Sequence, residues 1–196
     1  MTKTQIISNA LALLGQKPIN SLQNQNSLVS SAEQAFDYLV PYILSTGFWR
    51  FATTIVQLSE LVTVPIVTQW SYIYELPADY LKLVRLYPHN YAYEIYADKQ
   101  MYSNVQGPLY LEYIFQPTVG QLPYYFNGYL IYRIAEYLAL SNAQNVQFSQ
   151  KLKDDMGVAM GVALAADAQN RPQTPLISQP IINNRAVSWF YSSQGG

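Results

Sequence analysis

Few residues of this 196-residue sequence are of the types that carry out acid–base, nucleophilic or metal chemistry. Cysteine is absent, and the single histidine, His89, stands in a Pro-His-Asn turn. The sequence contains neither a G-x-S-x-G elbow nor an H-E-x-x-H pattern, which would give a nucleophile or a metal its partners. We therefore predict an exposed turn position for His89 and expect no catalytic thiol, no metal and no cofactor.

Paired carboxylates are the remaining route to catalysis, because glycosidases need two of them. The acidic residues that could serve occur in three local pairs: Glu75 and Asp79, Glu94 and Asp98, and Asp154 and Asp155. The first two pairs are separated by turn-like sequence, and the third consists of neighbours on a predicted helix that point to different faces. We predict structural or solvent-exposed roles for them, while a hydrolase that uses these carboxylates stays an alternative.

The composition shows what fills the polar positions instead. Half of the residues are hydrophobic and only 12% are charged, whereas 18 are tyrosine; ordinary domains are about one quarter charged. Tyrosine is enriched at protein interfaces because it supplies both apolar area and a hydroxyl group. We therefore predict an obligate component of an assembly. Compositional drift, or a carbohydrate-binding module that uses the aromatic side chains, are the alternatives.

The charge balance bears on the possible partners. Eleven basic residues stand against twelve acidic ones, which gives a net charge of -1. General binders of nucleic acids or anionic membranes carry a basic excess, so the charge argues against both kinds of partner.

The first fifteen residues have the spacing of an amphipathic helix and lack the continuous apolar region of a signal peptide. No apolar run reaches the ~18 residues of a membrane span. We expect a soluble protein that is made in a cytoplasm and has no membrane partner.

Two helices are predicted near the N-terminus. The first runs from Gln5 to Leu14, with Thr4 as its cap and Gly15 as its stop. The second begins near Ser27 or Ser30 and ends at Gly47. Pro41 lies inside the second helix, where it removes a backbone hydrogen bond, so we expect a kink or a split there.

Two more helices are predicted after Pro123. One extends to about residue 143 and the other covers residues 146–168. The expected inner face of the last helix consists of Leu152, Met156, Ala159, Met160, Ala163 and Ala166. Its small residues, Gly157 and Gly161 among them, are expected to let another helix approach closely.

Between the two helix pairs the sequence has the pattern of short strands. Five runs rich in Val, Ile, Thr, Tyr and Phe are separated by prolines and by Gly107-Pro108: residues 53–58, 72–76, 81–87, 91–97 and 109–115. The predicted fold class is α+β. It has a four-helix core of two N-terminal and two C-terminal helices (1–50 and 122–170), a β-rich insertion with one small antiparallel sheet (51–121), and an extended C-terminal arm (171–196).

The predicted arm has no acidic residue and three prolines, yet it keeps large apolar side chains. A solvated disordered tail is normally poor in aromatic residues. We therefore predict that the arm docks on a neighbouring chain, and a flap that folds back on its own domain stays the alternative. The candidate partner-binding residues are Ile181, Ile182, Arg185, Val187, Trp189, Phe190 and Tyr191.

Several motifs follow one another along the chain: Ala12-Leu13-Leu14-Gly15 with Pro18-Ile19-Asn20-Ser21-Leu22, the helix with Pro41, Trp49-Arg50-Phe51-Ala52, Leu76-Pro77-Ala78-Asp79-Tyr80, and the last two helices with Ala135-Glu136-Tyr137-Leu138-Ala139. In this order they resemble the head-to-tail adaptor proteins of short-tailed bacteriophages, the family called tail tubular protein A. Together they cover about residues 4–170. Relatives carry more charged residues and a shorter end, and nothing after Arg171 matches a family motif.

The resemblance implies a structural protein of the virion without catalysis. Such proteins form a homo-oligomeric ring, usually a dodecamer, below the portal of the capsid. The helical part contacts the neighbouring subunits and the portal, and the β part faces the tail nozzle (tubular protein). DNA passes through the lumen during ejection, and a lumen of low charge would grip few phosphates. By analogy with extended adaptor C-termini, the arm is expected to bind the portal protein. The rival hydrolase would then be a virion-associated cell-wall enzyme.

Overall fold

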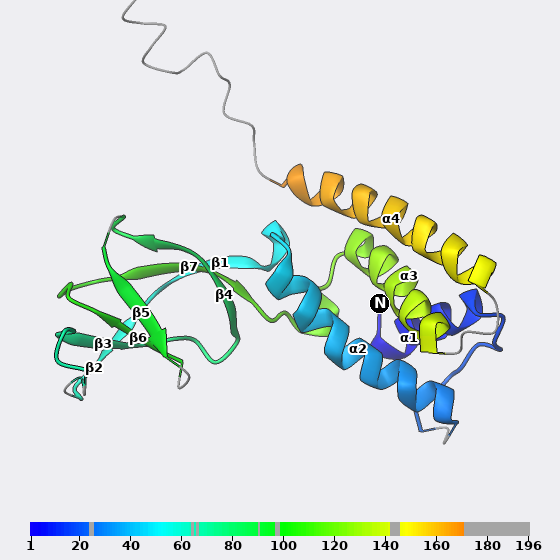
Figure 1. Cartoon of the computed structure of the whole chain (residues 1–196), viewed down its shortest axis with the longest axis horizontal. Helices are drawn as coiled ribbons and strands as arrows, with labels where there is room; N and C mark the ends of the chain where they lie inside the picture. Colours follow the sequence, from blue (N-terminus) through cyan, green and yellow to red (C-terminus); the bar gives the residue numbers. More distant parts are fainter. Residues whose placement is uncertain are drawn as a thin grey trace, which may run out of the picture.

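The computed structural model describes residues 1–23, 26–63, 65, 67–89, 91–96, 99–141 and 146–170. Helices and strands are segregated along the long axis of the molecule (Figure 1). The helical part contains α1 (Lys3–Leu13), α2 (Ser27–Thr46), α3 (Tyr124–Ser141) and α4 (Val146–Ala168), with short 3-10 turns η1 (Arg50–Ala52) and η2 (Val119–Gln121). The strands are β1 (Thr53–Gln57), β2 (Ser59–Leu61), β3 (Tyr72–Glu75), β4 (Tyr80–Tyr87), β5 (Tyr93–Tyr96), β6 (Gln100–Ser103) and β7 (Tyr110–Phe115).

Helix α1 begins earlier than predicted because Thr2, not Thr4, is its cap. The Thr2 hydroxyl accepts the Gln5 amide, and the Gln5 side chain accepts the Thr2 amide at 2.9 Å. Thr4 has Ile7 at the corresponding position, which cannot return such a bond. The stop at Gly15 is confirmed: its φ of +75° suits glycine, and the Gln16 amide donates to the Leu11 carbonyl.

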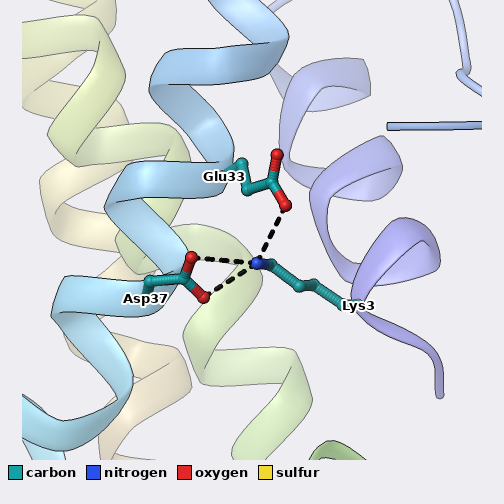
Figure 2. Close-up of polar contacts among 3 residues, drawn as sticks. All are labelled: Lys3, Glu33 and Asp37. Atoms are coloured by element: carbon teal, nitrogen blue, oxygen red, sulfur yellow. Dashed lines mark hydrogen bonds and ion pairs between the residues drawn. The ribbon is translucent and has the colours of Figure 1, made fainter. Parts of the chain in front are cut away.

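Helix α2 is one helix from Ser27 to Thr46. Of the two outcomes predicted at Pro41, a kink or a split, the split is therefore wrong. Proline removes only one backbone hydrogen bond, and the flanking residues Leu39, Val40 and Ile43 are buried in the core. Figure 2 shows how α2 holds the start of α1. The Lys3 Nζ donates to Glu33 at 3.1 Å and to Asp37 at 2.8 Å.

Helix α3 is the centre of the helical part, because it packs against α1, α2 and α4. Its buried residues include Phe126, Leu130 and Ile134, each fully inaccessible to solvent. Trp49 closes this core at the β side. Its indole ring lies edge-on to Phe126 with centroids 5.0 Å apart, and its Nε1 donates to the Ile43 carbonyl at 3.1 Å.

The predicted single small sheet is wrong, because the strands form two antiparallel sheets. One has the order β1-β7-β4 and the other the order β2-β3-β6-β5. Strands β2 and β6 were not predicted. β2 continues from β1 after Leu58, whose amide bonds to the Leu109 carbonyl. β6 is a four-residue strand that begins after Lys99, a residue with a φ of +55°, and it is too short to show a clear alternation.

A second hydrophobic cluster lies between these strands and includes Leu58, Leu76, Met101 and Leu109. The side chains of β7 alternate between two faces. Leu111 and Tyr113 face this second cluster, whereas Ile114 belongs to the helical core. The register between β4 and β7 shifts twice, next to Leu81 and Val84, and both side chains pack against the helical core. The three-stranded sheet therefore connects the two clusters.

Candidate interaction surfaces

Asp167 joins the end of α4 to the start of the β part. Its carboxylate is 2% exposed and accepts the backbone amides of Arg50 at 2.6 Å and Phe51 at 3.1 Å. These are the first amides of η1, which have no partner inside the turn. The Arg50 guanidinium in return donates to the Ala168 carbonyl at 3.0 Å. Asp167 thus fixes where α4 ends.

Tyr125 of α3 completes this junction. Its hydroxyl donates to Asp167 at 2.9 Å and accepts the side-chain amide of Asn170 at 3.1 Å. Burial and then the hydrogen bond to Asp167 raise the pKa of Tyr125 to about 12. Sequence reasoning missed this site, although Asp167 is the first charged residue after an uncharged stretch on α4.

Three exposed tyrosines gather where α2 lies against α3, and we call Tyr38, Tyr42, Tyr137 and the neighbouring Leu140 the tyrosine patch. The Tyr38 and Tyr42 rings stack with centroids 5.6 Å apart, and the Tyr38 and Tyr137 rings are 6.3 Å apart. Tyr38 remains 55% exposed and Leu140 59% exposed. The i, i+4 spacing of Tyr38 and Tyr42 was the available signal, because such residues share one helix face.

Helix α4 has a second exposed apolar surface. Residues 156–166 contain no charged or hydrogen-bonding side chain. Only Ala163 among them is fully buried, while Val158 is 69% and Val162 62% exposed. We call the exposed residues Gly157, Val158, Met160, Gly161, Val162, Leu164 and Ala165 the α4 apolar face.

Two predictions about α4 need correction. Met160, expected on the inner face, is 39% exposed. The close packing expected at Gly157 and Gly161 is also wrong, because a Cβ built on either glycine would have no atom within 4 Å. The reason is that α3 and η1 are the main contacts of α4 in the described structure. Leu152 and Ala163 are buried as predicted.

The candidate carboxylates are spread over the molecule. Asp154 and Asp155 lie on α4, whereas Glu94 lies on β5 in the β part (Figure 1). Asp79 accepts the Tyr113 hydroxyl at 3.0 Å, Glu75 ends β3 at the surface, and Asp98 lies outside the described residues. Within the described ranges, no three His, Asp or Glu side chains group so as to hold a metal ion.

Glu94 organises a small aromatic cluster at the edge of the four-stranded sheet. Its Oε2 accepts the Tyr96 hydroxyl at 2.6 Å, the Trp70 indole at 3.1 Å and the Gln69 amide at 3.3 Å. The hydrogen bonds from Tyr96 and Trp70 lower the pKa of Glu94. Because one carboxylate oxygen of Glu94 accepts three hydrogen bonds, this side chain is fixed in place and holds the cluster together.

His89 is exposed in a turn, as predicted, and its ring lies 4.6 Å from that of Tyr87. The candidate portal-binding residues Ile181, Ile182, Arg185, Val187, Trp189, Phe190 and Tyr191 all lie outside the described residues. None of the helices in the described part of the chain has the length and apolar character to cross a membrane.

The surfaces that remain are two apolar ones on the helical part and one aromatic cluster on the β part. The chain matches neither a protein-family model nor a curated protein sequence.

Proposed function

We propose that the chain is a structural subunit of a bacteriophage head-to-tail connector. It assembles into a homo-oligomeric ring of twelve subunits between the portal protein and the tail nozzle, and DNA passes through the lumen during ejection. The role involves no catalysis and no cofactor. The subunit is made in the host cytoplasm and becomes part of the virion. The observation that carries the proposal is the tyrosine patch on α2 and α3.

The tyrosine patch has the chemistry of a protein interface. Tyr38, Tyr42 and Tyr137 are already in ring contact with one another, so little side-chain entropy is lost when a partner covers them. Large exposed apolar groups that lie together mark association sites on soluble proteins. With a net charge of only -1 for the whole chain, subunits repel one another weakly.

A closed ring needs two different surfaces on each subunit, because neighbours meet head to tail. The tyrosine patch is the surface that we assign to contact between subunits. The resemblance in sequence supplies the orientation of each subunit in the ring, with the helical part toward the portal and the β part toward the nozzle. The aromatic end of the chain, residues 189–191, is the segment that we propose to bind the portal.

The test is the mass of the particles that the purified full-length chain forms, alone and with the portal of the same phage, by mass photometry. A variant with Tyr38→Ser and Tyr42→Ser should weaken ring formation about tenfold or more, since an interface tyrosine is typically worth more than 1 kcal/mol.

A matched control removes two tyrosines of similar exposure from the β part, Tyr91→Ser and Tyr110→Ser. Ring formation by this control should stay close to that of the unchanged chain. Equal losses in both variants would remove the tyrosine patch from the ring contact. A chain that remains monomeric with and without the portal would overturn the proposed function.

A further inference from the structure

The α4 apolar face requires a cover that the described residues do not provide. A helix that is apolar all round is normally buried on all sides, yet Val158 and Val162 are more than half exposed. Gly157 and Gly161 leave open space beside them, so the surface can receive bulky side chains from a partner. The rest of α4 shows that the exposure is local, because its first turns carry Lys151, Lys153, Asp154 and Asp155.

We propose that residues 176–187 of the same chain run back along α4 and cover the α4 apolar face. This segment supplies the bulky apolar residues that the face lacks: Leu176, Ile177, Ile181, Ile182 and Val187. It begins six residues after Asn170, where the described structure ends beside the end of α4. The intervening Arg171–Pro175 contains two prolines, which favour a turn and an extended chain rather than a continued helix.

The length of this segment fits the surface. The α4 apolar face spans nine residues from Gly157 to Ala165, or about 13 Å along the helix axis at 1.5 Å per residue. An extended chain advances about 3.3 Å per residue, so four or five residues cover that distance. Leu176 and Ile177 precede Ile181 and Ile182 by five residues, or about 16 Å of extended chain. With the second pair beside Gly157 and Val158, the first pair lies at the C-terminal end of α4.

The charges also fit. All twelve acidic residues precede residue 171, together with nine of the eleven basic ones, so this body has an acidic excess of three. The segment after Asn170 has Arg171 and Arg185 and no acidic residue. Arg171 comes three residues after Ala168, the last residue of α4, and the C-terminal end of a helix favours a nearby cation. Arg185 follows Ile182 toward the turn of α4 that carries Asp154 and Asp155.

This path also determines where the aromatic end of the chain goes. The end of α4 lies toward the β part and its start lies at the opposite end of the helical part (Figure 1). A segment that runs back along α4 therefore carries Trp189, Phe190 and Tyr191 to the end of the molecule away from the sheets. That end is the portal side under the proposed function, and only this last step of the inference rests on that proposal.

Disulfide trapping in the full-length chain tests the path, because the sequence contains no cysteine. The variant carries Val158→Cys and Ile182→Cys, both outside the buried core of the described structure. Under mild oxidation it should form an intrachain disulfide, identified by mass spectrometry and by mobility on a non-reducing gel. The matched control is Tyr124→Cys with Ile182→Cys. Tyr124 is 80% exposed and adjacent to Tyr125, which contacts Asn170, so an undocked segment would reach it as easily as Val158.

The Val158 pair should form its disulfide about tenfold faster than the control or more, because an undocked flexible segment offers only a millimolar effective concentration at either site. Equal rates for the two pairs would overturn the inference, and so would disulfides found only between chains. Particle mass is measured on the same samples. If rings form without the intrachain disulfide, this inference is wrong and the proposed function is not affected. If the disulfide forms in a chain that stays monomeric in the presence of the portal, the proposed function is wrong and this inference is not affected.

Discussion

Helices α3 and α4 follow one another in the chain and are both rich in apolar residues, yet they have opposite environments. Phe126, Leu130, Ile134 and Leu138 of α3 are all buried, because α1, α2 and α4 surround that helix. Among residues 149–168 of α4, whose burial the structure describes, only Leu152, Ala163 and Asp167 are buried. The difference teaches that the apolar content of a helix reports the total cover it needs, and that the described residues supply this cover for α3 but not for α4.

The largest effect that separates the two helices is expected from truncating an apolar side chain on each. Phe126→Ala should lower the free energy of unfolding by about 3–5 kcal/mol, since it leaves a cavity among Trp49, Phe51 and Tyr129. Met160→Ala on α4 should lower it by about 1 kcal/mol at most, because Met160 is 39% exposed in the described structure and an extended segment over the α4 apolar face covers it on one side only. Urea unfolding of the two full-length variants measures both. Similar losses would mean that α4 is as fully packed as α3.

The next effect concerns the polar contacts at the C-terminal end of α4. Asp167→Ala should lower the free energy of unfolding by about 2–4 kcal/mol, because it leaves two backbone amides and the Tyr125 hydroxyl without their acceptor. Hydrogen exchange should also quicken at the amides of Arg50 and Phe51. Asp154→Ala on the exposed part of the same helix is the control and should be nearly neutral. A neutral Asp167→Ala would show that η1 does not depend on α4.

The sequence predicted the helices well because each has a 3.6-residue period and a clear end signal. Residues 146–168 agree with α4 exactly, and Gly15 ends α1 as expected. The division into two sheets was missed because it depends on pairing between distant strands. Ser59–Leu61 is recognisable as a strand only beside β3, and Gln100–Ser103 only between β3 and β5.

The candidate surfaces were predictable only in part. Composition indicated an interface protein, but it could not tell which tyrosines are exposed. Tyr129 and Tyr137 lie on the same helix, and the first is 6% and the second 41% exposed. The reason is that Tyr129 packs against Trp49 and Phe126, whereas the ring contact of Tyr137 is with the exposed Tyr38. Likewise, the period of α4 placed Met160 on the inner face, but α3 covers only one side of the helix. Which neighbours a helix has is a tertiary property, and its own sequence does not contain it.

The smallest expected effect tests the polar link between the two helices through its pH dependence. The pKa of Tyr125 is raised from 10.0 to about 12 by burial and by its hydrogen bond to Asp167. Because the folded pKa lies above the unfolded one, this stabilisation is complete below about pH 10 and is lost as the pH rises toward 12. It amounts to about 1 kcal/mol at most, since Tyr125 is only partly buried and solvent screens it. Tyr125→Phe should therefore be slightly less stable at pH 8 but lose less stability between pH 10 and 12, as measured by urea unfolding.

Tyr113→Phe is the matched control, because burial and the hydrogen bond to Asp79 raise the pKa of Tyr113 to about 12 in the β part. If only Tyr113→Phe flattens the alkaline profile, the Tyr125–Asp167 contact does not couple α3 to α4, and the end of α4 is held by η1 alone.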